Sequence, residues 1–140
     1  MKRIVRIGKN RHHLEIEDYL KKISDLEVIN VKEVKESNKN VIQQDEGKRL
    51  LDKVIGYVIA LSEEGSQMDS VSFAKMIEKY PDISFIIGGA FGLSEEVKNK
   101  ANFLLSLSKM TLPHEMAFLV LVEQLYRAER ILEGHPYHKN

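Results

Sequence analysis

Short apolar runs alternate along this chain with segments in which apolar residues recur every three or four positions. Runs rich in β-branched and aromatic residues predict strands, whereas the three- to four-residue spacing predicts helices. Strands are expected at residues 4–8, 26–31, 57–61, 83–87 and 103–107. Helices are expected at residues 14–23, 47–54, 70–79 and 113–131, and a further helix is expected to open at Ser94.

Polar residues and glycines predict where these elements stop. Residues 32–40 show no periodic apolar face and are expected to form a mobile loop, and residues 62–66 are expected to form a turn. Asp69 or Ser70 is suited to cap one helix, as Ser94 is for the next. The last helix is expected to close near Gly134.

The order of the elements predicts a layered α/β domain with a parallel sheet. The continuous apolar runs at 57–61 and 83–87 are typical of strands buried on both faces, which favours parallel pairing. Ligands of such domains bind beyond the carboxyl ends of the strands. We therefore expect the loops 61–65, 88–92 and 108–114 to converge on one crevice.

Length and composition indicate one ordinary globular domain. A chain of 140 residues can bury one apolar core, so residues 1–140 are expected to form a single domain. Without cysteine, thiol catalysis and thiolate metal sites are excluded, and a reducing compartment is favoured. No apolar stretch approaches the roughly 20 residues that span a bilayer, so we expect no membrane association and a cytoplasmic location.

The charges balance overall but are unevenly distributed. A formal net charge of zero argues against nucleic acid as a partner, because phosphate binding normally leaves an excess of basic residues. If the N-terminus and residues 97–114 meet in space, however, they form a basic surface. The alternative is that these side chains only solvate exposed faces. The basic residues are Lys2, Arg3, Arg6, Lys9, Arg11, Lys98, Lys100 and Lys109.

Two loops offer backbone groups to a ligand. Glycines at 88, 89 and 92 let main-chain N–H groups approach where a Cβ atom would block them, although a tight strand-to-helix turn needs the same glycines. A nicotinamide dinucleotide site is disfavoured, because the glycine spacing differs from G-x-G-x-x-G and the loop lies late in the chain. Residues 107–114 offer the donors and acceptors that an adenine edge requires, or simply cap the last helix.

The C-terminal sequence His-Pro-Tyr-His at residues 135–138 contains groups suited to proton transfer and base stacking. A metal site formed with His114 has little support, because three imidazoles without fixed supporting residues make a weak pattern. A disordered terminus is the alternative. Arg127 and Arg130 on the last helix are by themselves typical of solvated charges.

Several segments taken together resemble one known family. They are FIIGGAFGLS at 85–94, LLSLSKMTLPHEM at 104–116, VLVEQLYRAERI at 120–131 and PYH at 136–138. The chain resembles the ribosomal RNA large-subunit methyltransferases that methylate N3 of a pseudouridine in 23S rRNA, within the SPOUT superfamily. The similarity spans nearly the whole chain and is densest after residue 80.

The resemblance implies an S-adenosylmethionine-dependent methyltransferase with a parallel-sheet α/β knot (SPOUT) fold and a C-terminal trefoil knot. It also implies a homodimer packed through the knot, 23S rRNA within the ribosome as the partner, and neither metal nor membrane. The implied cofactor contacts fall on the same three strand-end loops. They are Leu61, Gly88, Leu107, Ser108, Lys109, Met110, Thr111 and Leu112.

The implied chemistry assigns roles to the C-terminal residues. N3 of pseudouridine is an imide nitrogen that must lose its proton. We expect His138 to act as base or proton relay and Tyr137 to order the tail and the substrate base. Arg127 is expected to bind phosphate or stabilise the developing imide charge. The tail is a candidate for serving the partner subunit's cofactor, and the assembled ribosome is expected to supply much of the recognition.

Two departures from the family pattern bear on activity. Phe118 stands where the family usually carries an arginine, and the N-terminal half is shorter than in typical members. The first is expected to weaken RNA or cofactor contacts, and the second to alter docking on the ribosome. The alternative function is a non-catalytic ribosome- or RNA-binding protein that retains the knotted fold.

Overall fold

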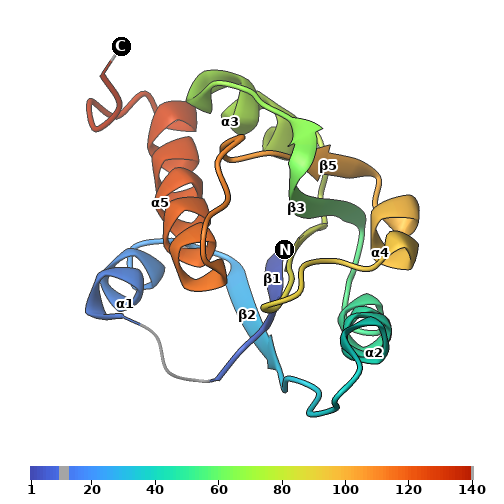
Figure 1. The fold of residues 1–140 in the computed structure, drawn as a ribbon. Coiled ribbons are helices and arrows are strands. Elements are labelled where there is room, and N and C mark those ends of the chain that lie inside the picture. Colours follow the sequence, from blue (N-terminus) through green and yellow to red (C-terminus); the bar gives the residue numbers. More distant parts are fainter. Residues whose placement is uncertain (10–12, 140) are drawn as a thin grey trace.

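A computed structural model describes residues 1–9 and 13–139 of the chain. At its centre lies a five-stranded sheet in which neighbouring strands are parallel and the order is β2-β1-β4-β3-β5 (Figure 1). The parallel α/β arrangement predicted from the sequence is therefore confirmed. The strands are β1 (Lys2–Ile7), β2 (Leu26–Val31), β3 (Tyr57–Ser66), β4 (Ile83–Ile87) and β5 (Phe103–Leu105).

Helices cover both faces of the sheet (Figure 1). The first, third and fifth helices pack together on one face, and the second and fourth pack together on the other. In the described part of the chain, no helix is both long and apolar enough to cross a membrane. The helices are α1 (Leu14–Leu20), α2 (Lys39–Leu51), α3 (Ser70–Glu78), α4 (Glu95–Lys100) and α5 (His114–Leu132).

Side-chain caps fix two of the helix starts where the sequence predicts them. Asp69 accepts a hydrogen bond from the N–H of Ser72 at the start of α3, and Ser94 accepts one from the N–H of Val97 at the start of α4. Each oxygen satisfies a first-turn donor that has no partner within its helix. After α5, Gly134 adopts a φ of +75°, as expected for a helix end.

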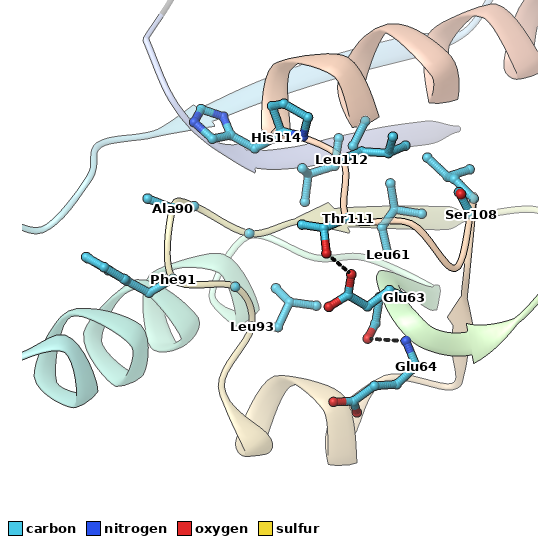
Figure 2. Close-up of a pocket in the computed structure, with 18 of the residues that line it drawn as sticks. Leu61, Glu63, Glu64, Ala90, Phe91, Leu93, Ser108, Thr111, Leu112 and His114 are labelled. Atoms are coloured by element: carbon cyan, nitrogen blue, oxygen red, sulfur yellow. Dashed lines mark hydrogen bonds between the residues drawn. The ribbon is translucent and has the colours of Figure 1, made fainter.

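Several predicted boundaries differ from the structure, and the largest differences are at the start of α2 and the end of β3. α2 begins at Lys39, inside the expected loop, because Asn38 accepts hydrogen bonds from the main-chain N–H groups two and three residues ahead. β3 continues through the expected turn to Ser66, because its second half pairs with β5 across a bulge opposite Leu105. The carboxylate side chains of Glu63 and Glu64 belong to this extension of β3 (Figure 2).

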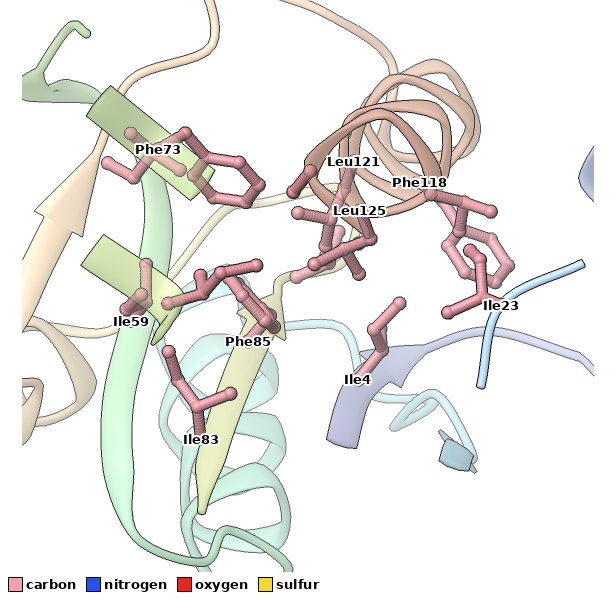
Figure 3. Close-up of a cluster of buried hydrophobic side chains, with 14 of the residues drawn as sticks. Ile4, Ile23, Ile59, Phe73, Ile83, Phe85, Phe118, Leu121 and Leu125 are labelled. Atoms are coloured by element: carbon pink, nitrogen blue, oxygen red, sulfur yellow. The ribbon is translucent and has the colours of Figure 1, made fainter. Parts of the chain in front are cut away.

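An apolar core lies on each side of the sheet. In the larger one, Phe85 of β4 lies near Phe73 of α3 and near Leu121 and Leu125 of α5 (Figure 3). Burial of each such side chain contributes about 1.5–3 kcal/mol to stability. The smaller core, beneath α2 and α4, includes Ile86 of β4. The larger core alone contains residues of α5, so it is this core that holds the last helix against the sheet.

The expected basic surface does not form from the N-terminal residues. Lys2 and Arg3 engage acids in ion pairs of 3.5 and 3.1 Å. Arg6 is fully buried, with its guanidinium carbon 4.4 Å from the centre of the Phe118 ring. Arg11 lies outside the described residues. Of the five N-terminal cations, the described structure leaves only Lys9 exposed and without an ion-pair partner.

Candidate functional site

A cavity of about 650 Å³, here called the first cavity, lies at the carboxyl edge of the sheet (Figure 2). It is lined by residues 61–64 of β3, residues 87–93 after β4, and most of the segment 107–114 between β5 and α5. The predicted convergence of three strand-end segments is therefore confirmed. A volume of roughly 300–1,000 Å³ is typical of sites for small molecules.

All of the residues predicted to contact a cofactor line the first cavity except Lys109. Lys109 belongs to the same loop, but its side chain is exposed and does not contribute to the lining. The residues that do line the cavity are Leu61, Gly88, Leu107, Ser108, Met110, Thr111 and Leu112.

The turn after β4 brings backbone against the first cavity. Gly92 has a φ of +75°, which glycine adopts without strain, and its N–H donates to the carbonyl of Gly89 at 3.1 Å. A Cβ atom at Gly88 would lie 2.9 Å from Cδ2 of Leu93 and 3.0 Å from the main-chain carbon of Gly92. The interpretation of these glycines as a tight turn is therefore confirmed, and the approach of a ligand to their main chain stays a prediction.

Side-chain hydroxyls fix the segment between β5 and α5. Ser106 donates to the carbonyl of Ser108 at 3.0 Å, and the Ser108 hydroxyl accepts from the N–H two residues ahead at 3.0 Å. Thr111 donates to Glu63 of β3 at 2.8 Å (Figure 2). Within the described chain, the N–H and C=O groups of residues 109–112 have no main-chain partner. These groups can pair with a planar ligand that both donates and accepts.

The sequence did not lead us to three residues of the first cavity, two of which add carboxylates to its wall and one of which adds an aromatic ring. Glu63 and Glu64 place carboxylates in its wall, and Glu64 pairs with Lys98 at 3.3 Å. Phe91 lines the cavity while remaining 41% exposed. Two signals were present in the sequence, namely a pair of acids just after an apolar strand and an aromatic residue inside a glycine loop.

The three residues predicted to be catalytic lie together beyond the middle of α5. Arg127 donates through Nε to Glu123 at 2.7 Å, and its Nη1 lies 3.1 Å from Nδ1 of His138. Its guanidinium carbon lies 4.7 Å from the centre of the Tyr137 ring. Because a guanidinium only donates, this contact places the lone pair of a neutral imidazole on Nδ1 and its proton on Nε2. Glu123, which orients Arg127, was not predicted.

His138 lines a different cavity from all of the predicted cofactor residues except Leu107. This second cavity, of about 450 Å³, includes Ser70 of α3 and Gln124 of α5 in its lining. Leu107 lines both the first and the second cavity. Within one chain, the segment around Leu107 therefore stands between His138 and the first cavity.

Tyr137 is expected to titrate at a much higher pH than a free tyrosine. Burial raises the pKa of Tyr137 to about 12, and a hydrogen bond with Tyr19 adds to this rise. Because docking of the tail raises the pKa of Tyr137, the neutral phenol stabilises the docked tail. This stabilisation is complete below the pKa of a free tyrosine, about 10, and is lost as pH rises through 12. The difference in tyrosinate absorbance between wild type and Tyr137→Phe should have its midpoint near 12. A midpoint near 10 would show that the tail is undocked.

The metal site considered for His114 with the two C-terminal histidines does not form in the described structure. His114 and His135 lie at opposite ends of α5, whose 19 residues span about 28 Å. Among the residues that the structure describes, no group of three or more His, Asp or Glu side chains is arranged to hold a metal ion.

Comparison with known proteins gives consistent matches over the whole chain. The profile of a family described as predicted SPOUT methyltransferase matches residues 1–138. The chain is 45% identical over 128 residues to the ribosomal RNA large subunit methyltransferase H of Acholeplasma laidlawii, covering 86% of this chain and 85% of that protein. It is 39% identical over 156 residues to the protein of the same name from Streptococcus agalactiae, covering 98% of each. A structure of a probable methylase family protein from Haemophilus influenzae shares the fold, with a TM-score of 0.63 and 16% identity over 99% of this chain and 70% of that one.

Proposed function

The chain belongs to the family of predicted SPOUT methyltransferases, and we propose that it transfers a methyl group from S-adenosylmethionine to N3 of a pseudouridine in 23S ribosomal RNA. The assembled ribosome is the proposed substrate. The observation that carries the proposal is the first cavity, where backbone from three strand ends meets in one ligand-sized space. Relatives named as ribosomal RNA large subunit methyltransferases support the choice of substrate class.

The first cavity fits S-adenosylmethionine in size and chemistry. Leu61 and Leu107 give apolar walls. The main-chain groups of residues 109–112, apart from the N–H of Met110 that donates to Ser108, are free in the described structure to match the edge of an adenine. The carboxylate of Glu63, which accepts from the Thr111 hydroxyl, complements a ligand that is positively charged at its sulfur and its amino group, whereas Glu64 is balanced by Lys98. When bound, S-adenosylmethionine supplies a methyl group activated by the positive charge on its sulfur.

We assign removal of the N3 proton of the acceptor to His138 of the C-terminal tail, together with Arg127 of α5. As N3 bonds to the methyl carbon and the carbon–sulfur bond breaks, the N3 proton passes to His138. Its Nδ1 accepts from Arg127 in this structure, so His138 becomes a base when Arg127 turns from the imidazole toward the substrate. Arg127 then faces the imide oxygen on which charge develops. Tyr137 holds the tail in place, because its ring packs edge-on against the ring of Tyr126 with 4.7 Å between the ring centres.

The proposal includes a homodimer and a trefoil knot in the C-terminal part of the chain. Because Leu107 stands between His138 and the first cavity of the same chain, we assign each tail to the cavity of the partner subunit. Met110 is 78% exposed and Met116 is 47% exposed, both next to the first cavity. Such apolar side chains are suited to burial against a second copy.

Binding and transfer are tested separately. The purified protein is expected to bind S-adenosylmethionine in isothermal titration calorimetry and to methylate ribosomes that lack the modification. Mass spectrometry of the digested RNA should locate the methyl group on N3 of a pseudouridine. Binding without transfer would favour the non-catalytic RNA-binding alternative, and absence of binding would overturn the proposal. Equal methylation of free rRNA would contradict the assignment of the assembled ribosome as substrate.

A further inference from the structure

A third cavity, of about 600 Å³, lies at the carboxyl ends of β1 and β2. Its wall is formed by Asn30 of β2, by the chain that leaves β1 and β2, and by the first turn of α5. His114 lines both the first and the third cavity, so the two are neighbours at the start of α5. None of the residues predicted to hold a cofactor lines the third cavity.

A fully buried arginine fixes the polar groups in the wall of the third cavity. Nη1 of Arg6 donates to the side-chain oxygen of Asn30 at 2.5 Å and to the carbonyl of Lys9 at 3.0 Å, and Nη2 pairs with Glu115. A Cβ atom at Gly8 would lie 2.5 Å from Nη2 of Arg6, so a side chain there would displace the guanidinium. Asn30 and Glu115, both held in this way, line the cavity.

One acceptor in this wall has no donor. Oε2 of Glu115 is buried and forms no hydrogen bond with any described residue. A carboxylate oxygen in this position accepts but cannot donate, and leaving it unpaired is unfavourable.

The rim of the third cavity carries unpaired positive charge. Its lysines are exposed, and none forms an ion pair with another described residue. Glu33 is the acid that faces them, so three lysines less one acid leave a net charge of +2 while Glu115 is balanced by Arg6. The three lysines are Lys9, Lys32 and Lys35.

Positive charge continues from this rim toward the first cavity. Lys39 opens α2, and its ammonium nitrogen lies 5.5 Å from the centre of the Phe91 ring. Phe91 lines the first cavity with its side chain partly exposed. Unpaired bases stack on exposed rings of this kind, whereas the phosphates between them pair with lysines. The order of groups from Lys9 to Phe91 thus matches the repeating chemistry of a single strand of RNA.

We propose that the third cavity is an RNA-binding subsite, in which the lysine rim holds the phosphates next to the methylated nucleotide and the cavity receives one unpaired neighbouring base. This inference rests on the proposed function, which brings the acceptor base to the adjacent first cavity. The neutral total charge of the chain is no obstacle, because the lysines at this one edge are not neutralised by partners.

Removing the charge of the rim tests the subsite. The triple substitution Lys9→Gln, Lys32→Gln and Lys35→Gln is expected to raise the KM for ribosomes more than about tenfold at moderate salt. The logarithmic dependence of KM on salt should become shallower by about 2, since each lost contact to single-stranded phosphate removes about 0.7. The kcat and the affinity for S-adenosylmethionine should stay unchanged, because none of these lysines lines the first cavity.

A matched variant carries the same loss of charge elsewhere. Lys21, Lys75 and Lys79 are exposed and line none of the three cavities, so changing them to glutamine should leave the KM and its salt dependence near wild type. If wild type methylates ribosomes and the rim variant behaves like this control, the subsite is wrong and the methyltransferase stands.

Sedimentation with large ribosomal subunits gives a second readout that does not depend on methylation. If wild type binds subunits without methylating them and the rim variant binds more weakly than the control, the subsite stands and the proposed function falls. If wild type neither binds subunits nor methylates them, both proposals are overturned. Both are also overturned if wild type binds subunits without methylating them and the two variants bind as strongly as wild type.

Discussion

Replacing His138 by alanine is expected to lower the kcat of ribosome methylation by about 10²- to 10⁴-fold, the usual contribution of a positioned acid–base group. The affinity for S-adenosylmethionine should change little, because the residues proposed to bind the donor are those of the strand-end loops, and His138 is assigned to the proton of the acceptor. Loss of the acidic limb from the pH profile of kcat is the distinguishing result, since the limb reports protonation of the imidazole. Single-turnover rates across pH, compared with calorimetric binding, measure both quantities.

His135→Ala is the matched control for this experiment. His135 belongs to the same tail and accepts a hydrogen bond from the N–H of Tyr137 at 3.1 Å, so its loss tests the order of the tail rather than proton transfer. It should lower kcat modestly and keep the acidic limb. Equal losses in the two variants, with the limb kept in both, would remove His138 from the proton-transfer role.

Replacing Glu115 by alanine is expected to destabilise the fold by about 3 kcal/mol and to lower the melting temperature by roughly 10 °C. Burial lowers the pKa of Arg6 and the ion pair with Glu115 opposes this, so removing the carboxylate leaves a buried charge without its counter-ion. The expected loss lies at the low end for broken buried pairs because the Glu115 side chain is 35% exposed. Urea and thermal unfolding followed by circular dichroism measure the change.

Restoring charge balance should recover much of this stability. The double variant Arg6→Leu with Glu115→Ala removes both charges, and exchanging a buried pair for apolar groups is often neutral. We expect it to melt well above Glu115→Ala alone. A double variant less stable than both single variants would show that the guanidinium contributes packing against Phe118 and Asn30 that exceeds the cost of its burial.

Local patterns predicted the fold best where packing is local. β4 begins and ends at the predicted residues because an apolar run identifies a buried strand directly, and β2, an edge strand, does so because its apolar residues alternate with polar ones. The start of α2 was missed because its cap, Asn38, lies in a polar stretch without an apolar face. The second half of β3 was missed because its pairing with β5 depends on Leu105, far along the chain.

The same limit applied to the site. Strand-end reasoning located the first cavity and, together with the family resemblance that the comparisons confirm, most of its lining residues. Arg6 was taken for a surface cation, although it is fully buried. Its partners Asn30 and Glu115 stand 24 and 109 positions away, and no pattern within one segment indicates such contacts.

Leu107 is a shared wall, because its side chain lines the first and the second cavity at once. Trimming this leucine to glycine is therefore expected to widen both spaces together and to open a passage between them.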